Sequence, residues 1–285
     1  MLLSLGYHIH KTDNKYKTSI ERGLKLGKKY GFDIKNIQIY VIGPNNSFEI
    51  LTDDDKKYFK KLSDTHNILI HASHLDHILG TKHRFTLINI KKEFDIYKEI
   101  GALALIVHIP DKNPKDIVSA LDDIMKSSPD GNLYLEIENY HKMSKYNYAE
   151  ISNIKKLFKL IRIKDYSDRI GLCVDTAHLW TSGIEIDTYD KASEWIDELT
   201  TSYTGKIIIQ LNDQKWEFNS GSDEHKSLTK GTIWREFNSK GFSDIKKSGI
   251  MAFIDWAIDK DIVVMLERKK IEQIEPDLLL LSKII

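Results

Sequence analysis

The sequence predicts an α/β protein of the (β/α)8 TIM barrel type, from two features of its hydrophobic pattern. Short apolar runs that suit buried parallel strands alternate with longer segments in which apolar residues recur every three or four positions. Eight such runs are present, which is the number of strands that closes this kind of barrel. The expected strands are residues 2–8, 37–42, 67–72, 104–108, 133–138, 170–175, 206–211 and 262–266.

The segments between these runs have the spacing of amphipathic helices. Ile20, Leu24 and Tyr30 would lie on one face of the first helix. Further helices are expected around residues 87–97, 114–126, 151–163, 191–200, 250–258 and 276–284. A doubly wound open sheet is the alternative, but no Gly-x-Gly-x-x-Gly turn follows the first strand, which counts against a dinucleotide site.

Composition limits the number of domains and the kinds of partner. The chain has 285 residues with only five prolines and no Pro/Gly/Ser-rich linker, so residues 1–285 are expected to form one domain. Lys and Arg together number 42, as do Asp and Glu, so no global field attracts nucleic acid or a membrane surface. Any nucleic-acid site must therefore depend on local charge.

The single cysteine and the absence of long apolar segments bear on location. Cys173 alone cannot form an intrachain disulfide, which fits a reducing compartment. The opening residues are too short an apolar run for a signal peptide, and no stretch approaches the length of a membrane span. The protein is expected inside the cell, in the cytoplasm, or in the nucleus or a viral factory if its source is eukaryotic or viral.

Residues 171–178 form the stretch around which the candidate site is organised. Three apolar residues that suit a buried strand lead into Asp175, and His178 follows three positions later. A turn through Thr176 and Ala177 would let the carboxylate and the imidazole face one point, and such ligands suit a zinc-like metal. The alternative is a helix-capping aspartate with an incidental histidine.

Metal-capable side chains stand at the ends of most of the other expected strands as well. Barrel enzymes build their sites from these carboxyl-terminal strand ends. A cluster of carboxylates at the barrel mouth would repel strongly unless cations held it together. The residues are His8 with His10 just beyond it, His71, His108, Glu138, Asp175, Gln210 and Glu267, with Asp223 and His225 in the loop after the seventh strand.

Mixed histidine and carboxylate ligands of this number indicate more than one metal ion. Two or more metals within about 4 Å of each other suit phosphoryl chemistry, because one can supply hydroxide while another holds the leaving oxygen. A single-metal sugar isomerase would need only two glutamates, an aspartate and one further ligand. The loops at this face are also basic and aromatic, including Lys226 and Trp216, which suits phosphates and stacked bases, although lysine is frequent throughout the chain.

Several of these stretches resemble the motifs of the endonuclease IV family of abasic-site DNA repair enzymes, which are xylose-isomerase-like TIM barrels. Residues 171–178, Gly-Leu-Cys-Val-Asp-Thr-Ala-His, closely resemble the family's Gly-x-Cys-x-Asp-Thr-Cys-His signature. Residues 211–215 followed by 223–228 are similar to its Leu-Asn-Asp-x-Lys and Asp-x-His-x-Ser-Leu segments. Residues 71–75, 6–9 and 266–267 also match family motifs, so the resemblance spans nearly the whole chain.

The resemblance implies a barrel that binds up to three zinc ions and hydrolyses the phosphodiester 5′ to an abasic site in double-stranded DNA, leaving a 3′-hydroxyl. A 3′-phosphodiesterase activity is implied as a companion. His71, His108 and a strand-five glutamate would bind the first zinc. That glutamate, Asp175, the strand-seven end and Glu267 would bind the second, and His178, Asp223 and His225 the third. A metal-bridged hydroxide is the implied nucleophile, with Glu267 orienting it.

Two departures from the family concern its metal ligands. Gln210 stands where the family has a histidine, and an amide oxygen is a weaker zinc donor, so the second metal is expected to be looser or of another kind, such as manganese. Residues 138–141 lack the sequence that usually follows the family's glutamate. Glu136 has the same inward parity as Glu138, and both stay open as the ligand. We prefer Glu138, as ligand and catalytic residue, because it lies nearer the mouth.

The expected DNA contacts depart from the family too. His74 replaces a tyrosine that enters the DNA stack, while Leu75 is retained as a wedge. Asn45 lies in a second loop that lacks the arginines common there, and Lys226 adds a basic contact.

The sequence therefore predicts a metal-dependent abasic-site endonuclease that acts as a monomer. The alternative is a single-metal sugar isomerase or epimerase, which would not need His71, His108, His178, Asp223 and His225. A third hypothesis is a lesion-binding protein that lost catalysis through Gln210.

Overall fold

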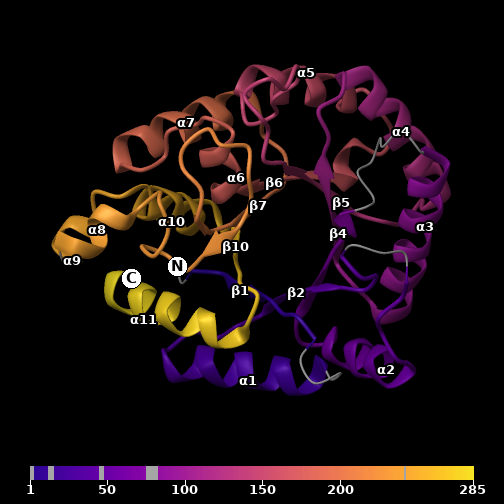
Figure 1. The fold of residues 1–285 in the computed structure, drawn as a ribbon. Coiled ribbons are helices and arrows are strands. Elements are labelled where there is room, and N and C mark those ends of the chain that lie inside the picture. The colour runs from indigo at the N-terminus through magenta and orange to yellow at the C-terminus, as the bar shows by residue number, and fades with distance from the viewer. Residues whose placement is uncertain (1–2, 12–15, 45–47, 75–82, 241) are drawn as a thin grey trace.

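A computed structural model describes residues 3–11, 16–44, 48–74, 83–240 and 242–285. Eight parallel strands form a closed barrel in the order β1-β10-β7-β6-β5-β4-β3-β2, and helices surround it (Figure 1). The (β/α)8 prediction is confirmed, and the open-sheet alternative is excluded. The barrel strands are β1 (Leu5–His8), β2 (Asn36–Tyr40), β3 (Asn67–His71), β4 (Ala104–Ile109), β5 (Leu133–Ile137), β6 (Ile170–Asp175), β7 (Ile207–Gln210) and β10 (Val263–Glu267).

Each helix expected from the hydrophobic pattern is present, and the described residues contain four further α-helices that were not predicted. The expected ones are α1 (Tyr16–Lys29), α3 (His83–Ile100), α4 (Pro114–Ser127), α5 (Ile151–Ile161), α7 (Tyr189–Ser202), α10 (Gly249–Lys260) and α11 (Glu275–Ile284). The additional ones are α2 (Asp53–Leu62), α6 (Thr176–Thr181), α8 (Arg235–Lys240) and α9 (Phe242–Ile245). A two-stranded antiparallel sheet of β8 (Asp213–Gln214) and β9 (His225–Lys226) lies outside the barrel.

Helix α2 escaped prediction because it is almost entirely charged. Only Asp55 and Phe59 are buried in it, so it has no apolar stripe to detect. The helix is instead specified at its start, where Thr52 and Asp55 form a capping box.

Helix α6 replaces the turn expected between Asp175 and His178. Asp175 is its N-cap, and one carboxylate oxygen accepts hydrogen bonds from the backbone of Ala177 and His178 at 2.7 and 3.1 Å. The capping role of Asp175 in the alternative interpretation is thus confirmed, whereas His178 is buried and faces Asp223. The capping role does not exclude a ligand role, because the second carboxylate oxygen faces other partners.

The barrel interior is layered, and this layering positions the site. A small apolar cluster fills the inside of the barrel, separate from the main core between strands and helices; it comprises Leu69, Ala104, Ile106, Cys173, Ile208 and Met265. Strand side chains alternate in direction, so the residue two positions further along faces the same interior. One layer nearer the mouth these inward residues are all polar: His71, His108, Asp175, Gln210 and Glu267.

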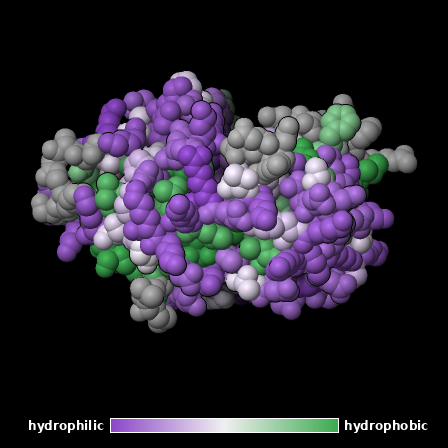
Figure 2. Space-filling model, turned by 90° about the horizontal axis from the view of Figure 1, so that it is seen from below, coloured by the Kyte–Doolittle hydropathy of each residue, from purple (hydrophilic) through white to green (hydrophobic). Residues whose placement is uncertain are grey.

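The outer surface is that of an ordinary barrel. Seen from the side of α1, the surface is mainly hydrophilic, and hydrophobic residues are exposed mostly across the middle of this face (Figure 2). None of the helices in the described part of the chain combines the length and the apolar character needed to cross a membrane.

Candidate metal centre

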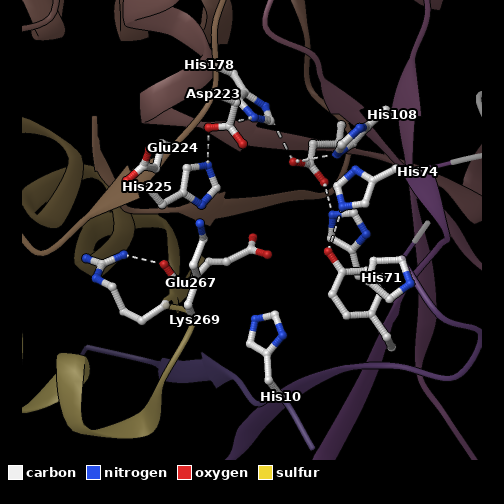
Figure 3. Close-up of a pocket in the computed structure, with 14 residues that line it drawn as sticks. His10, His71, His74, His108, His178, Asp223, Glu224, His225, Glu267 and Lys269 are labelled. Atoms are coloured by element: carbon white, nitrogen blue, oxygen red, sulfur yellow. Dashed lines mark hydrogen bonds and ion pairs between the residues drawn. The ribbon is translucent and has the colours of Figure 1, made fainter. Parts of the chain in front are cut away.

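A cavity of about 510 Å³ opens at the carboxyl-terminal ends of the strands. Histidine and carboxylate side chains from many strands and loops converge on it (Figure 3). The lining residues include His10, Tyr40, His71, His74, His108, Glu136, His178, Asp223, His225, Glu267 and Lys269. The structure therefore gathers most of the predicted metal ligands around one space.

The first ligand group is His71, His108 and Glu136, which come from β3, β4 and β5. Glu136 lies between the two rings, with its oxygens 3.3 Å from His71 Nε2 and 3.2 Å from His108 Nε2. His71 Nδ1 donates to the backbone carbonyl of Ala72 at 2.8 Å. Since a carbonyl can only accept, that nitrogen holds the proton and Nε2 keeps its lone pair in the neutral ring. This is the usual arrangement of a metal-binding histidine.

Glu138 lies on the other side of His108. Its carboxylate is 2.6 Å from His108 Nδ1, and it also accepts from the backbone of Asn139. Burial alone would raise the pKa of Glu138, but the charge and hydrogen bond of His108 outweigh it and hold the pKa at about 2. Of the two glutamates left open by the sequence, Glu136 has the geometry of the ligand. Glu138, the preferred one, instead has the geometry of a group that orients His108.

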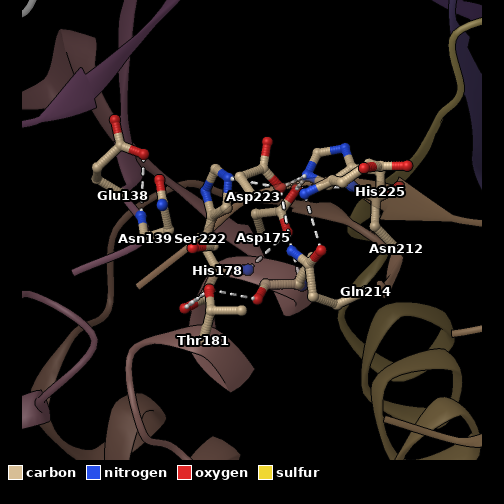
Figure 4. Close-up of polar contacts among 12 residues, drawn as sticks. Glu138, Asn139, Asp175, His178, Thr181, Asn212, Gln214, Ser222, Asp223 and His225 are labelled. Atoms are coloured by element: carbon tan, nitrogen blue, oxygen red, sulfur yellow. Dashed lines mark hydrogen bonds and ion pairs between the residues drawn. The ribbon is translucent and has the colours of Figure 1, made fainter. Parts of the chain in front are cut away.

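The second ligand group is Asp175, His178 and His225, with Asp223 beside it. His225 Nε2 is 3.1 Å from Asp223 and 3.5 Å from Asp175. His178 donates from Nδ1 to the carbonyl of Ile137 at 2.8 Å, which turns Nε2 toward Asp223 at 3.7 Å. The signature histidine and the two loop residues therefore meet as predicted by the resemblance (Figure 4).

Amide side chains that the sequence prediction did not single out support this group. Asn212 donates to Asp175 at 2.6 Å, and Gln214 donates to Asp223 at 3.1 Å (Figure 4). Both belong to residues 211–215, a segment that resembles a family motif, and that resemblance could have identified them as site residues. Buried Arg268 in turn donates to the side-chain oxygen of Asn212 at 2.6 Å.

An ion pair inside the fold fixes this arginine. Arg268 donates to Asp277 at 2.8 Å, and both side chains are almost completely buried. Arg268 also donates to the backbone carbonyl of Glu267 at 2.6 Å. The pair therefore links α11 to residues that hold two of the predicted ligands, Asp175 and Glu267.

Gln210 is fully buried at the centre of the inward layer. In the amide orientation that satisfies both ends of the side chain, its nitrogen donates to Asp175 at 3.0 Å and to Glu136 at 2.8 Å. Its oxygen then accepts from Gln38 at 3.1 Å. An NH2 group directed at two carboxylates is a hydrogen-bond donor to them, whereas a metal ligand must present a lone pair to the ion.

Glu267 approaches His8 across the β1–β10 pair. Its Oε1 lies 2.5 Å from His8 Nδ1. Burial would raise the pKa of Glu267, but the charge and hydrogen bond of His8 outweigh it, so the pKa is lowered and the carboxylate stays ionised.

At Glu136 and His225 too, burial and neighbouring charges shift the pKa in opposite directions, and the neighbouring charges prevail. Burial raises the pKa of Glu136 less than the charges of His108 and His71 lower it, so the net shift is well below its usual range. Burial lowers the pKa of His225, but Asp223 and Asp175 outweigh it and raise the pKa to about 9. Protons on the histidines thus compensate the buried carboxylates, and a divalent cation can take over that role.

The residues fit metal ions by donor type and by their unsatisfied atoms. Imidazole nitrogens and carboxylate oxygens are the ligands that zinc and related ions prefer. Among the described residues, His8 Nε2 is buried without a hydrogen-bond partner. Buried polar atoms without partners are rare in folded proteins, so this atom is compatible with an ion bound nearby.

The predicted DNA contacts are placed only in part. The His74 ring lines the cavity, where its Nε2 is 2.9 Å from the Tyr40 hydroxyl, so it lies within the pocket. Burial, with the charges of His71 and His108, lowers the pKa of His74 to about 3, so the ring is neutral. Lys226 pairs with Glu224 at 2.9 Å. Asn45 and Leu75 lie outside the described residues.

Comparisons with known proteins agree with this fold and site. The family described as xylose isomerase-like TIM barrel matches residues 24–254. A protein of African swine fever virus named "Probable AP endonuclease" is 33% identical over 256 residues, which are 88% of this chain and 84% of that protein. The crystal structure of AsfvAP:AG superposes with a TM-score of 0.84 at 28% identity, covering 98% of this chain and 96% of that one.

A bacterial structure shares the fold at lower identity. Endonuclease IV from Thermus thermophilus superposes with a TM-score of 0.74 at 17% identity, covering 98% of this chain and 99% of that one. The chain belongs to the xylose isomerase-like TIM barrel family and, within it, to the endonuclease IV group of AP endonucleases. It is accordingly an enzyme of the metal-dependent hydrolase class.

Proposed function

We propose that the protein hydrolyses the phosphodiester 5′ to abasic sites in double-stranded DNA, with up to three divalent cations, zinc above all, and leaves a 3′-hydroxyl. The name of the viral relative and the superposition with AsfvAP:AG support the substrate class. Removal of blocking groups from a DNA 3′ end, a 3′-phosphodiesterase reaction, would use the same site, because the bond broken is of the same kind.

The observation that carries this proposal is the number of ligand groups at the mouth. One cation would be held by His71, His108 and Glu136, and another by Asp175, His178 and His225 with Asp223. Glu267 is proposed for a further cation, with manganese as the alternative to zinc there. Gln210 would join Glu267 by turning its amide oxygen toward the ion. A hydrolase of phosphodiesters needs charge on both sides of the reacting phosphorus, and these groups surround one cavity.

When bound, such cations lower the pKa of water toward 7 and neutralise the charge that develops on the leaving oxygen. The chain supplies the positioning. Glu267 is held ionised by His8, so it can accept a hydrogen bond from the attacking water and orient it. Glu138 fixes the His108 ring through Nδ1, and the carbonyl of Ile137 fixes His178 in the same way.

Charge and shape at the mouth suit a phosphate backbone. Lys269 lines the cavity next to Glu267, and in Figure 3 its ammonium points into the space between Glu267 and His225. A lysine there can bind a non-bridging phosphate oxygen. His74, Lys226, Asn45 and Leu75 are proposed to contact the DNA around the lesion. All the proposed ligands come from one chain, so a monomer suffices.

A single-metal sugar isomerase would need none of the histidine pairs at this mouth. The experiment that separates the two functions is incubation of the purified protein with an abasic duplex and, in parallel, with a panel of aldoses and ketoses. We expect one cut 5′ to the lesion, with a 3′ end that a DNA polymerase extends directly. Sugar interconversion without cleavage would overturn the proposal, and binding without cleavage would indicate a lesion-binding protein.

A further inference from the structure

Two histidines, His8 at the end of β1 and His10 just beyond it, lie beside the predicted ligand Glu267 without belonging to either ligand group described above. The strand pairing places His8 directly opposite Glu267 on the neighbouring strand β10. His10 follows two residues beyond the end of the strand, and its ring lies on the same side as that of His8. The rings of His8 and His10 stack with centroids 4.6 Å apart and planes 8° apart. The barrel closure thus brings two imidazoles and one carboxylate together.

These three side chains have the composition of a metal site. One ligand atom from each of His8, His10 and Glu267 lies within 4.8 Å of the others. His8 and Glu267 are buried, and His10 is half-buried and points into the cavity toward Glu267 (Figure 3). Two imidazoles and a carboxylate with an open side are a common ligand set for a divalent transition-metal ion.

The His8 ring is held in place through one of its nitrogens, and the other nitrogen faces no hydrogen-bond partner in the described part of the chain. Its Nδ1 lies 2.9 Å from the amide nitrogen of Gln38 and 2.5 Å from Glu267. Its Nε2 is buried and has no hydrogen-bond partner among the residues the structure describes. His71 and His178 are also held through Nδ1, there by a backbone carbonyl, and at both of them Nε2 faces a carboxylate.

The orientation of the Gln210 amide explains why a cation would bind beside His8 and His10 rather than at the centre of the mouth. The amide nitrogen donates to Asp175 and Glu136, so it occupies lone pairs of the two carboxylates that a central cation would need. Glu267 instead contacts His8 on the neighbouring strand β1. A cation bound by Glu267 therefore finds stronger donors in two imidazoles than in the amide of Gln210.

We propose that His8, His10 and Glu267 form a binding site for a divalent transition-metal ion, and that this site takes the cation that Glu267 would otherwise share with Asp175 and Gln210. The protein then holds its cations in three separate groups: His71 with His108 and Glu136, Asp175 with His178 and His225, and this one. The proposal concerns ion binding and does not depend on the identity of the substrate.

The test is to count bound metal in a His10→Ala variant. His10 is chosen because it is half-buried, so its loss spares the packing beneath the mouth. Full-length protein would be loaded with Zn²⁺ or Co²⁺, dialysed against a weak chelator and measured by elemental analysis, with Co²⁺ absorption bands as a second readout. His66→Ala is the matched control, since His66 precedes β3 at the opposite end of the barrel.

We expect His10→Ala to lose one equivalent of metal, or to bind it at least about tenfold more weakly, which is the smallest effect expected from disturbing a ligand set. His66→Ala should keep the wild-type count. Adding Gln210→His to His10→Ala should restore the lost equivalent, because an imidazole returns to the centre. Wild-type metal content and affinity in folded His10→Ala would overturn the proposal, as would a double variant that stays one equivalent short. Abasic cleavage by the wild-type protein, measured separately, tests the proposed function on its own.

Discussion

Exchanging each of two neighbouring glutamates for glutamine tests which of them is the strand-five ligand. Glu136 lies within 3.3 Å of both His71 and His108, so Glu136→Gln removes the charge that pairs two buried imidazoles. Breaking a buried charge pair costs about 3–5 kcal/mol. As a loss of metal affinity, that is roughly two to four orders of magnitude. Glu138→Gln removes only the group that orients His108, which typically costs about 10–100-fold.

The assay is titration of each metal-free variant with Zn²⁺ in competition with a chromophoric chelator, with circular dichroism as the control for folding. We expect Glu136→Gln to lose the first cation at concentrations where Glu138→Gln still binds it. Cleavage of abasic duplex should follow the same order. If Glu138→Gln were the more damaging variant in both measurements, the ligand assignment argued from these distances would be refuted.

Three further substitutions test other parts of the account. Glu267→Gln should abolish cleavage while leaving DNA binding, measured by fluorescence anisotropy, nearly unchanged, because it removes a charge and keeps the shape; near-normal turnover would sink the role given to Glu267. Gln210→His should slow the loss of metal during chelator treatment, since imidazole is the stronger donor, and unchanged retention would argue against Gln210 lying beside a cation. Asp277→Asn leaves buried Arg268 with a neutral partner, so the free energy of unfolding should fall by about 3–5 kcal/mol and the melting temperature by roughly 5–8 °C. A thermal melt within 1–2 °C of wild type would contradict this view of the ion pair.

The strand ends were predictable because barrels impose a simple rule. Apolar runs located the strands, and His71, His108 and Asp175 were expected together because each ends a strand at the carboxyl-terminal face of the barrel. The fold follows from the hydrophobic pattern alone.

The choice between Glu136 and Glu138 was beyond the sequence, because both have the same parity and their depth depends on the tilt and stagger of β5 relative to β4. In the structure His108 is paired with Glu136 across those strands, and that register favours Glu136 as the ligand. The direction of the Gln210 amide was also unpredictable, since it depends on Gln38 from a distant strand.

Among the features that the sequence did not predict, helix α2 and the Arg268–Asp277 pair were missed for different physical reasons. Helix α2 is mostly charged and is specified by its capping box, so periodicity did not find it. The Arg268–Asp277 pair joins the end of β10 to α11, and nothing local in the sequence shows that the two residues face each other.

The most direct measurement of the central claim uses an end-labelled duplex that contains one abasic analogue. The protein would be assayed as purified, after chelation, and after Zn²⁺ is restored. The account predicts a single cut 5′ to the analogue that disappears with the metal and returns with it. Cleavage that persists in chelated protein shown by elemental analysis to be metal-free would contradict the claim that these histidines and carboxylates form a hydrolytic metal centre.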